Sequence, residues 1–398
     1  MPQVKTAPSR PSPQLQKAPG YVRCMEVYLT DKCNMSCANC AVHRPGKTSE
    51  SRCLKWEELK AAVDTLMDPK QVPHKGEKVL LLAGGEPFMA YPLLLKAAKY
   101  IAGLPQRPSV YVYTNGTLAK PQWVRELRGH GFMVIFSLDG DKTGNDKFRT
   151  FKGQGKKSVW DAVMKNIESL PMDAPLGTST VLRPGNLDGI LAALDKFSKA
   201  GFQACDLWID YLHVWTDEEL KSLEVFMQKF ADYYYTRTTK EGKIPFYVPM
   251  LHHALYNAVC LKQGKAWWRD CFRITVGADG NYYDCQGVLC APYAKLAAFA
   301  INHVASGKGV DWKTREAYMN EAAAYLDKLG ADRDWQHVCP RVYYKVAKVL
   351  GADPKPFVDN LHRVSRIFLQ GFVKLAGRLR EHPSFNDFYV SADLTIVG

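Results

Sequence analysis

Residues 25–40, MEVYLTDKCNMSCANC, carry the strongest signal in this sequence for both architecture and chemistry. Residues 25–29 are rich in strand-forming side chains and predict a short β-strand. The loop after it has three cysteines in a CxxxCxxC arrangement, namely Cys33, Cys37 and Cys40. In parallel α/β barrels the chemistry gathers at the carboxyl ends of the strands. A cysteine-rich loop in this place therefore predicts a reactive centre.

The spacing of these cysteines indicates the kind of centre. Three thiolates on one short loop can bind three irons of a cubane [4Fe–4S] cluster and leave the fourth iron without a protein ligand. An open coordination position distinguishes a reactive metal centre from a structural one, as it does for catalytic zinc. The alternative is a zinc site, for which paired CxxC sequences and a nearby fourth ligand are expected.

Beyond this loop, β-rich runs alternate with helical stretches. The predicted strands are 25–29, 78–82, 110–114, 134–138, 177–182 and 205–212, and the predicted helices between them lie near 55–67, 91–103, 121–130, 158–170 and 187–200. Such alternation predicts an α/β fold with a parallel sheet. Six units favour a partial, TIM-like (β/α)6 barrel over the closed eightfold barrel. Ser158 with Asp161, and Thr216 with Glu219, have the spacing of helix-capping boxes.

Polar and glycine-rich segments follow the next three strands. After the second comes GGEP, residues 84–87, in which two glycines allow close approach of the main chain and Glu86 offers an acceptor for a cationic amine. After the third comes YTNGT, with Thr114 and Asn115. After the fourth comes SLDG, followed by NDKFR.

This succession of motifs resembles the radical S-adenosylmethionine (SAM) superfamily. Within it, the sequence looks like the SPASM/twitch branch, which includes the anaerobic sulfatase-maturating enzymes and many peptide maturases. The resemblance extends from about Cys24 to Cys339. It implies that SAM chelates the fourth iron through its amino and carboxylate groups and is split reductively. The resulting 5′-deoxyadenosyl radical would abstract a hydrogen atom from the substrate.

The resemblance also implies which residues contact SAM. Glu86 and its glycines would receive the ammonium group, Ser137 and Arg149 the carboxylate, and Val181 or Leu182 the adenine. The implied SAM-binding set is Gly84, Gly85, Glu86, Pro87, Thr114, Asn115, Ser137, Asp139, Arg149 and Leu182. One departure is Asn39, since the family often has an aromatic residue just before the third cysteine.

A second group of cysteines follows the barrel pattern. The segment CFRITVGADGNYYDC, residues 271–285, predicts a hairpin that turns at Asp279–Gly280, with Cys271 and Cys285 at its two ends. It resembles the opening of a SPASM or twitch domain, but the later CxxCxxxxxC run of a complete SPASM domain is missing. The resemblance therefore implies one auxiliary [4Fe–4S] cluster. Its ligands would be Cys271, Cys285, Cys339 and either Cys260, which we favour, or Cys290.

An alternative for the second group is a zinc ribbon or a set of buried thiols. If an auxiliary cluster takes an electron from a substrate radical, a general base usually removes a proton as well. Asp210, at the end of the sixth strand, and Asp284, beside Cys285, are candidates. In the sulfatase-maturating relatives an acid follows the second hairpin cysteine. Gln286 stands there in this chain, which argues against oxidation of serine or cysteine to formylglycine.

The sequence leaves several substrate classes open. The leading hypothesis is modification of a peptide or protein side chain, with electrons from a flavodoxin- or ferredoxin-like reductant. Alternatives are a dehydrogenase or epimerase of a sugar, cyclitol or aminoglycoside, an RNA-modifying enzyme, and a non-catalytic iron–sulfur protein. The net charge of +13 suits an anionic partner, which includes acidic peptides and nucleic acid.

Composition bears on compartment and domains. No apolar run approaches the length of a membrane span, and residues 1–20 lack the apolar core of a secretory signal. Eleven cysteines without an export signal favour a reducing compartment, so we predict a cytoplasmic protein. The predicted parts are a disordered basic tail (1–22), the barrel (23–235), a twitch-like domain (236–345) and a helical extension (346–398). An apolar stripe over 361–379 favours a helix packed on its own domain over one lying on a membrane surface.

Overall fold

The structure is a computed structural model that describes residues 22–38, 40, 52–153, 155, 157–170, 176–210, 213–252, 254–255, 271–329 and 341–385. Its centre is a curved sheet with the strand order β6-β5-β4-β3-β2-β1-β7-β8-β9. The first six strands are all parallel and neighbouring, which confirms the predicted α/β partial barrel. They are β1 (Cys24–Tyr28), β2 (Val79–Ala83), β3 (Ser109–Thr114), β4 (Phe132–Ser137), β5 (Leu176–Leu182) and β6 (Ala204–Ile209).

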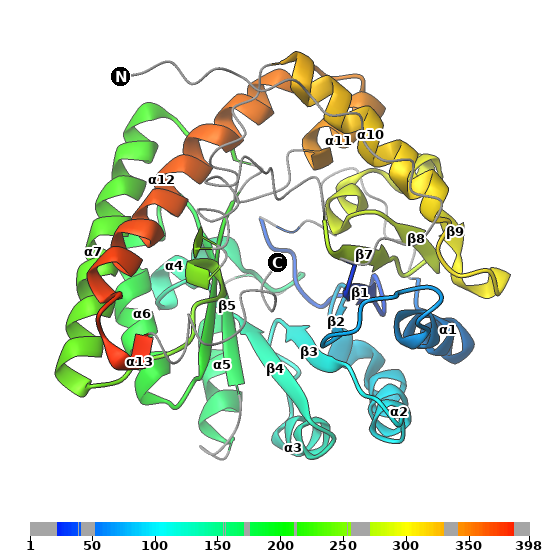
Figure 1. Cartoon of the computed structure of the whole chain (residues 1–398). Coiled ribbons are helices and arrows are strands. Elements are labelled where there is room, and N and C mark those ends of the chain that lie inside the picture. Colours follow the sequence, from blue (N-terminus) through cyan, green and yellow to red (C-terminus); the bar gives the residue numbers. More distant parts are fainter. Residues whose placement is uncertain are drawn as a thin grey trace.

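Helices cover the outer face of this sheet (Figure 1). They are α1 (Trp56–Met67), α2 (Tyr91–Ala102), α3 (Pro121–Gly129), α5 (Val159–Glu168) and α6 (Leu187–Lys199), close to the predicted ranges. Two short helices, η1 (Pro87–Ala90) and α4 (Lys142–Phe148), were not predicted. Thr216 and Glu219 form the reciprocal capping box that the sequence predicted. At the other predicted box, the Ser158 side chain accepts a hydrogen bond from the Asp161 N–H, which is half of the expected pair.

Strand β1 separates two environments. Met25, Val27 and Leu29 are fully buried in the main hydrophobic core beneath the helices. Because side chains alternate along a strand, Cys24, Glu26 and Tyr28 lie on the opposite, inner face. Tyr28 belongs there to a second apolar cluster, with Ala83, Tyr283 and Leu289 among its members.

The predicted hairpin is present, and it extends the barrel sheet. Strand β7 (Arg273–Val276) pairs in parallel with β1, and β8 (Asn281–Tyr283) returns antiparallel to β7. At the turn, Gly280 has φ +77°, and a Cβ there would lie 2.5 Å from the His303 ring. Glycine is therefore required at this position on two counts.

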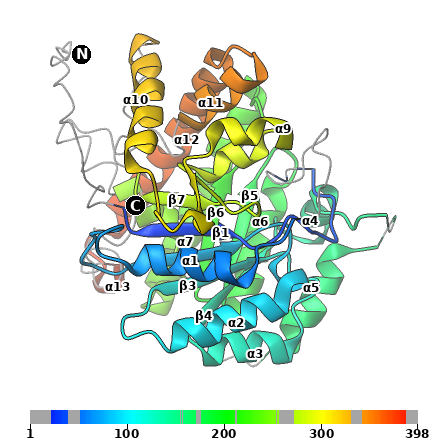
Figure 2. The same ribbon diagram turned by 90° about the vertical axis from the view of Figure 1, so that its right-hand side faces the viewer.

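The chain after the hairpin consists of short elements and longer helices. These are η3 (Gln286–Cys290), α9 (Tyr293–Leu296), η4 (Ala297–Phe299), β9 (Asn302–His303), η5 (Val304–Ser306), α10 (Trp312–Lys328), α11 (Arg341–Leu350), α12 (Lys355–Leu379) and α13 (Pro383–Phe385). Figure 2 shows α9, α10 and α11 on one side of the sheet and α1, α2 and α3 on the other.

Helix α12 runs alongside α7 (Asp217–Glu241) (Figure 1). Phe372 of α12 meets Phe230 of α7 edge-on, with ring centroids 5.7 Å apart, and meets Phe368 at 4.9 Å. The whole predicted apolar stripe of α12 is buried, which confirms that it packs on its own chain. No helix within the described ranges is long and apolar enough to cross a membrane.

The contact between α12 and α7 generates a stability prediction. Replacing the fully buried Phe372 by Ala removes two ring contacts and leaves a cavity. We expect the free energy of unfolding to fall by about 3–5 kcal/mol in chemical denaturation. The matched control is Val225→Ala, which shortens an exposed apolar side chain on α7. It should change the free energy of unfolding little. An equal effect of both variants would contradict a packed α12.

Candidate functional site

The cysteine loop after β1 is held in place by a neighbouring segment. Backbone hydrogen bonds join Ser36 to Thr150 and Ala38 to Phe148, at 2.8 and 2.9 Å. The structure brings the three thiols together, because each lies near enough to influence the ionisation of another. Burial, with a smaller contribution from neighbouring thiolates, raises the pKa of Cys33 to about 12 and that of Cys37 to about 11.

The Cys33 and Cys37 thiols would therefore have to lose their protons to bind iron, which makes such binding dependent on pH. Among the residues that the structure describes, no three His, Cys, Asp or Glu side chains gather around a point that would hold a single metal ion. A cubane cluster does not require such a point, because each of its irons takes its own thiolate. The three thiols of Cys33, Cys37 and Cys40 fit a [4Fe–4S] cluster in which one iron has no protein ligand.

The two glycines of GGEP lie against the cysteine loop. The Gly85 backbone N–H donates to the Thr30 carbonyl at 2.6 Å, and the Glu86 N–H donates to the Lys32 carbonyl at 2.8 Å. A Cβ on Gly84 would lie 2.5 Å from the Thr30 carbonyl oxygen, and one on Gly85 would lie 2.2 Å from that of Lys32. The close approach that the glycines allow is therefore made to the cysteine loop itself. Their predicted contact with SAM stays a prediction.

Glu86 is fully buried and joins two loops. Its Oε1 accepts hydrogen bonds from the Phe88 N–H at 3.0 Å and the Thr114 hydroxyl at 2.7 Å, and its Oε2 accepts one from the Asn115 N–H at 2.7 Å. Burial raises the pKa of Glu86 to about 7, against these hydrogen bonds. The Asn115 amide in turn donates to Cys33 Sγ at 3.8 Å. Glu86 thus fixes the loop that supports the first cysteine.

These contacts bear on the predicted SAM-binding residues. The Thr114 hydroxyl is buried and fully used, because it donates to Glu86 and accepts from the Gly116 N–H at 3.0 Å. The Asn115 side chain is also hydrogen-bonded within the protein, because its Nδ2 donates to Asn34 Oδ1 and its Oδ1 accepts from the Thr117 N–H. Pro87 is buried as the first residue of η1. Their contribution to the site is to shape the loops after β2 and β3.

Asp139 and Arg149 form a two-pronged ion pair beside the cysteines. Arg149 Nε and Nη2 donate to the fully buried Asp139 carboxylate at 2.8 and 3.1 Å. The Val181 N–H donates to the same carboxylate at 2.9 Å. Although burial opposes it, the Asp139 carboxylate raises the pKa of Arg149, so the guanidinium stays charged near Cys37 and Cys40. Nη1 of Arg149 makes no hydrogen bond to the described residues and is the group best suited to receive an anionic ligand.

The end of β5 places Val181, rather than Leu182, on the side of the site. Leu182 is fully buried in the main core beneath the helices. Val181 is half-buried and points to the opposite face of the strand, as does Ser179, the register partner of Ser137. The adenine contact predicted for Leu182 therefore suits Val181 better.

The two predicted general bases are both engaged in ion pairs. Asp210 Oδ2 lies 2.7 Å from Arg183 Nε. Asp284 contacts the Lys345 ammonium, and although burial acts in the opposite direction, Lys345 and Arg341 lower its pKa. A carboxylate with a lowered pKa is a weak proton acceptor, so this geometry does not favour Asp284 as a base.

Of the second cysteine group, the structure describes Cys271, Cys285 and Cys290. Cys271 and Cys290 are buried and Cys285 is half-buried, with Cys271 and Cys285 at the two ends of the hairpin as predicted. Cys260, Cys339 and Asn39 lie outside the described residues. Among the cysteines with no predicted partner, Cys24 and Cys205 are buried and Cys53 is exposed.

The sequence interpretation missed a polar cluster on the inner face of the barrel. Tyr28 donates to Glu26 Oε1 at 3.0 Å, and Arg273 Nη1 lies 3.9 Å from Glu26 Oε2. The Trp208 indole N–H donates to Asp206 at 2.5 Å. Burial raises the pKa of Glu26, and it raises that of Asp206 to about 6. The available signal was a lone acid inside each of two otherwise apolar strands, MEVYL and CDLWI.

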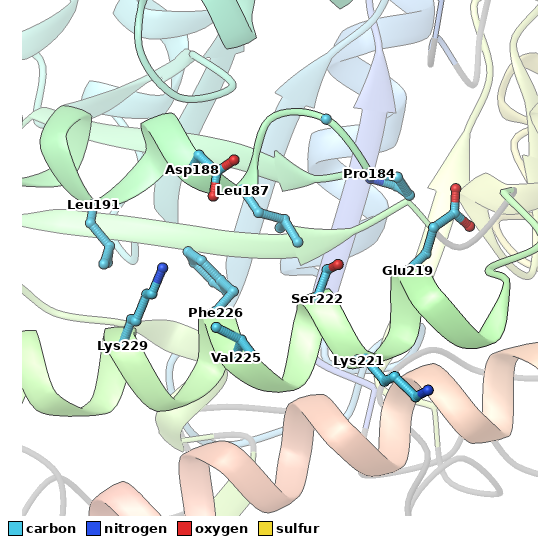
Figure 3. A pocket seen from close by; sticks show the side chains of 11 residues that line it. Pro184, Leu187, Asp188, Leu191, Glu219, Lys221, Ser222, Val225, Phe226 and Lys229 are labelled. Atoms are coloured by element: carbon cyan, nitrogen blue, oxygen red, sulfur yellow. The ribbon is translucent and has the colours of Figure 1, made fainter.

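A groove of about 630 Å³ lies between α6 and α7 (Figure 3). It is lined by acidic side chains (Asp188 and Glu219), basic side chains (Lys221 and Lys229) and apolar side chains such as Phe226. None of the predicted site residues lines this groove, so its geometry does not connect it to the cysteine loop.

Comparison with known proteins is consistent with this site. Residues 27–226 match the family model described as "Radical SAM superfamily". The curated Fe-coproporphyrin III synthase of Methanosarcina barkeri is 30% identical over 169 residues, which is 42% of this chain and 39% of that protein. The chain thus spans well under half of that relative's length.

Solved structures share the fold over two thirds or more of the chain. A structure described as "Native anSMEcpe with bound AdoMet" matches with a TM-score of 0.64 and 14% identity, over 92% of this chain and 99% of that one. Streptococcus suis SuiB, solved with the precursor peptide SuiA, matches with a TM-score of 0.51 and 14% identity, over 68% and 61% of the two chains.

The Asp139–Arg149 pair generates a second stability prediction. In Asp139→Asn the buried guanidinium loses its charged partner, so we expect about 3–5 kcal/mol less stability in denaturation of the cluster-free protein. Asp359→Asn removes a carboxylate of the same kind from the exposed Lys355–Asp359 pair and should leave the unfolding midpoint nearly unchanged. Similar midpoints for the two variants would contradict a structural role for the buried pair.

Proposed function

This chain belongs to the radical SAM superfamily, and from that premise we propose that it is an enzyme that modifies a side chain of a peptide or protein. The SAM-bound cluster supplies a one-electron cleavage of SAM and, from it, a radical able to remove a hydrogen atom from an unreactive carbon. The protein's part is to hold the cluster by Cys33, Cys37 and Cys40, to orient SAM, and to present the substrate.

The chain's own residues suit these tasks. We propose that Arg149, through its Nη1 group, binds the SAM carboxylate together with Ser137, and that Val181 packs against the adenine. We propose that the main chain at Gly84 and Gly85, held against the cysteine loop by hydrogen bonds from the Gly85 and Glu86 N–H groups, receives the ammonium group. Glu86, Pro87, Thr114, Asn115 and Asp139 hold these groups in position.

The observation that supports a peptide substrate is the extent of the shared fold. The anSMEcpe structure solved with AdoMet and the Cp18Cys peptide covers 92% of this chain at a TM-score of 0.63. SuiB was likewise solved with a peptide. A small-molecule substrate is the second candidate, because the Fe-coproporphyrin III synthase is the more similar in sequence, at 30% identity.

Buried cationic side chains near the hairpin support an auxiliary [4Fe–4S] cluster there. Arg315, Arg341 and Lys345 are all buried and all act electrostatically on the Asp284 carboxylate. Arg315 Nη2 donates to the backbone carbonyl of Cys271 at 2.8 Å. Buried charge is costly unless it is compensated, and a cluster held by four thiolates carries net negative charge. Its proposed ligands remain Cys271, Cys285, Cys339 and Cys260, with Cys290 as the alternative to Cys260.

Iron analysis tests the auxiliary cluster. In a variant with Cys33, Cys37 and Cys40 all changed to Ala, anaerobic reconstitution should leave about four irons per chain. Adding Cys271→Ala and Cys285→Ala should remove them, whereas adding Cys53→Ala, at an exposed thiol, should not. If almost no iron remains in the first variant, the hairpin cysteines hold no cluster.

Turnover tests the substrate class. The reconstituted enzyme, supplied with SAM and a flavodoxin- or ferredoxin-type reductant, is incubated anaerobically with a library of acidic peptides. We expect 5′-deoxyadenosine together with a mass change in a peptide. Formation of 5′-deoxyadenosine with every peptide unchanged would count against the peptide assignment. A sugar or aminoglycoside lighter by two hydrogens, or carrying one solvent deuterium, would then favour the small-molecule candidate, and RNA binding that weakens with salt would favour nucleic acid.

A further inference from the structure

Arg315 of α10 is a fully buried cation with one unused donor. It is 1% exposed, and its Nη2 group donates to the carbonyl oxygens of Cys271 at 2.8 Å and of Arg273 at 3.0 Å. Its Nε–H has no hydrogen-bond partner among the described residues. A guanidinium keeps its charge in proteins, and a buried donor almost always has a partner. The unused Nε–H therefore indicates a ligand that binds beside Arg315.

The two hydrogen bonds place the guanidinium at the open end of the hairpin. The Phe272 carbonyl accepts a hydrogen bond from the Cys24 N–H of β1. Because carbonyl groups alternate in direction along a strand, those of Cys271 and Arg273 point to the other side of β7, which is the side of β8. Arg315 binds them there, in the position that a longer β8 would occupy.

Both proposed cluster ligands of the hairpin belong to this end. The last residues paired between β7 and β8 are Thr275 and Tyr283. Two residues further along both strands, the same register would set Arg273 opposite Cys285. Arg315, bound to the Arg273 carbonyl, thus lies next to the strand end of one cysteine and on the side of the other.

Arg315 differs from a neighbouring cation in its partners. Lys345 of α11 contacts the Asp284 carboxylate directly. Arg315 acts on the same carboxylate electrostatically, and within the described ranges it forms no salt bridge. Its charge and its free N–H are therefore available to an anionic ligand other than Asp284.

We infer that Arg315 is a positioning residue of the auxiliary cluster: its Nε–H donates to a sulfur atom of the cluster, and its fixed charge raises the cluster's reduction potential. Reduction adds one electron and makes the cluster one unit more negative, which a buried cation favours. Net charge and hydrogen bonds to the sulfurs are among the factors that set the potentials of iron–sulfur proteins. The inference rests on the proposed function, because the auxiliary cluster is itself proposed there.

A potentiometric titration of the auxiliary cluster tests this role. The anaerobically reconstituted holoenzyme is reduced stepwise with redox mediators, and the reduced clusters are followed by electron paramagnetic resonance (EPR). The auxiliary signal is the one that persists when Cys33, Cys37 and Cys40 are changed to Ala. In Arg315→Gln, which loses the charge, we expect the ratio of reduced to oxidised cluster at a given potential to fall about 10-fold, a downward shift of about 59 mV for one electron.

Two further variants separate charge from packing. Arg315→Lys keeps the charge and loses the Nε–H, so its midpoint potential should lie between those of the wild type and Arg315→Gln. The matched control is Lys328→Met, which removes an exposed positive charge about 20 Å further along α10 and should leave the potential unchanged. An unchanged midpoint in Arg315→Gln with full iron content, or an equal shift in the control, would overturn the inference.

A measurement on the wild-type protein does not depend on how the variants fold. The holoenzyme is labelled with arginine that carries ¹⁵N only in its guanidino group, and the reduced auxiliary cluster is examined by pulsed EPR. We expect a weak coupling to ¹⁵N that disappears in Arg315→Lys. A reduced cluster without any ¹⁵N coupling would contradict the proposed hydrogen bond and overturn the inference.

Iron content separates this inference from the proposed function. If the variant that lacks Cys33, Cys37 and Cys40 holds almost no iron, the auxiliary cluster is absent, and the inference falls with that part of the proposed function. If it holds about four irons and its potential does not depend on Arg315, the inference alone is wrong.

Discussion

The contact between Gly84–Gly85 and the backbone of residues 30–32 is the constraint on which the rest of the site depends. It allows the loops after β1 and β2 to approach within hydrogen-bonding distance, because a Cβ at either glycine would overlap a carbonyl oxygen. Glu86 then accepts a hydrogen bond from the Asn115 N–H in the loop after β3, and the Asn115 side-chain amide donates one to Cys33 Sγ. The cysteines are thus positioned by backbone packing among three strand ends, which leaves the thiols themselves available to iron.

Buried charge is distributed unevenly over the molecule. Beside the cysteine loop Arg149 is paired with Asp139, and its guanidinium lies near enough to Cys37 and Cys40 to interact with them electrostatically. Near the hairpin the buried Arg315, Arg341 and Lys345 act on Asp284, and on the inner face of the barrel Arg273 acts on the buried Glu26 and Asp206. Because burial of charge is unfavourable without compensation, the cations near the hairpin favour the proposed auxiliary cluster, which would be anionic.

Much of the fold was predictable from local signals. The strand–helix alternation gave the parallel sheet, the Asp279–Gly280 turn gave the hairpin, and the apolar stripe of α12 gave a packed helix. These predictions succeeded because each rests on the periodicity or turn chemistry of a short segment. The pairing of β7 with β1 was not predicted, since it joins residues nearly 250 positions apart and has no local signature.

For the site, the sequence by itself determined the donor set of the iron centre and the order of the motifs around it, because CxxxCxxC and GGEP encode ligands and backbone freedom within a few residues. Only the tertiary structure decided what the neighbouring side chains do. It engaged Asp210 with Arg183, turned Leu182 into the core and Val181 toward the site, and placed the Arg315 guanidinium against the Cys271 carbonyl. The physical reason is that the curvature of the barrel and the pairing of distant strands set the burial and charge at these positions. Neither can be predicted from the sequence of a single short segment.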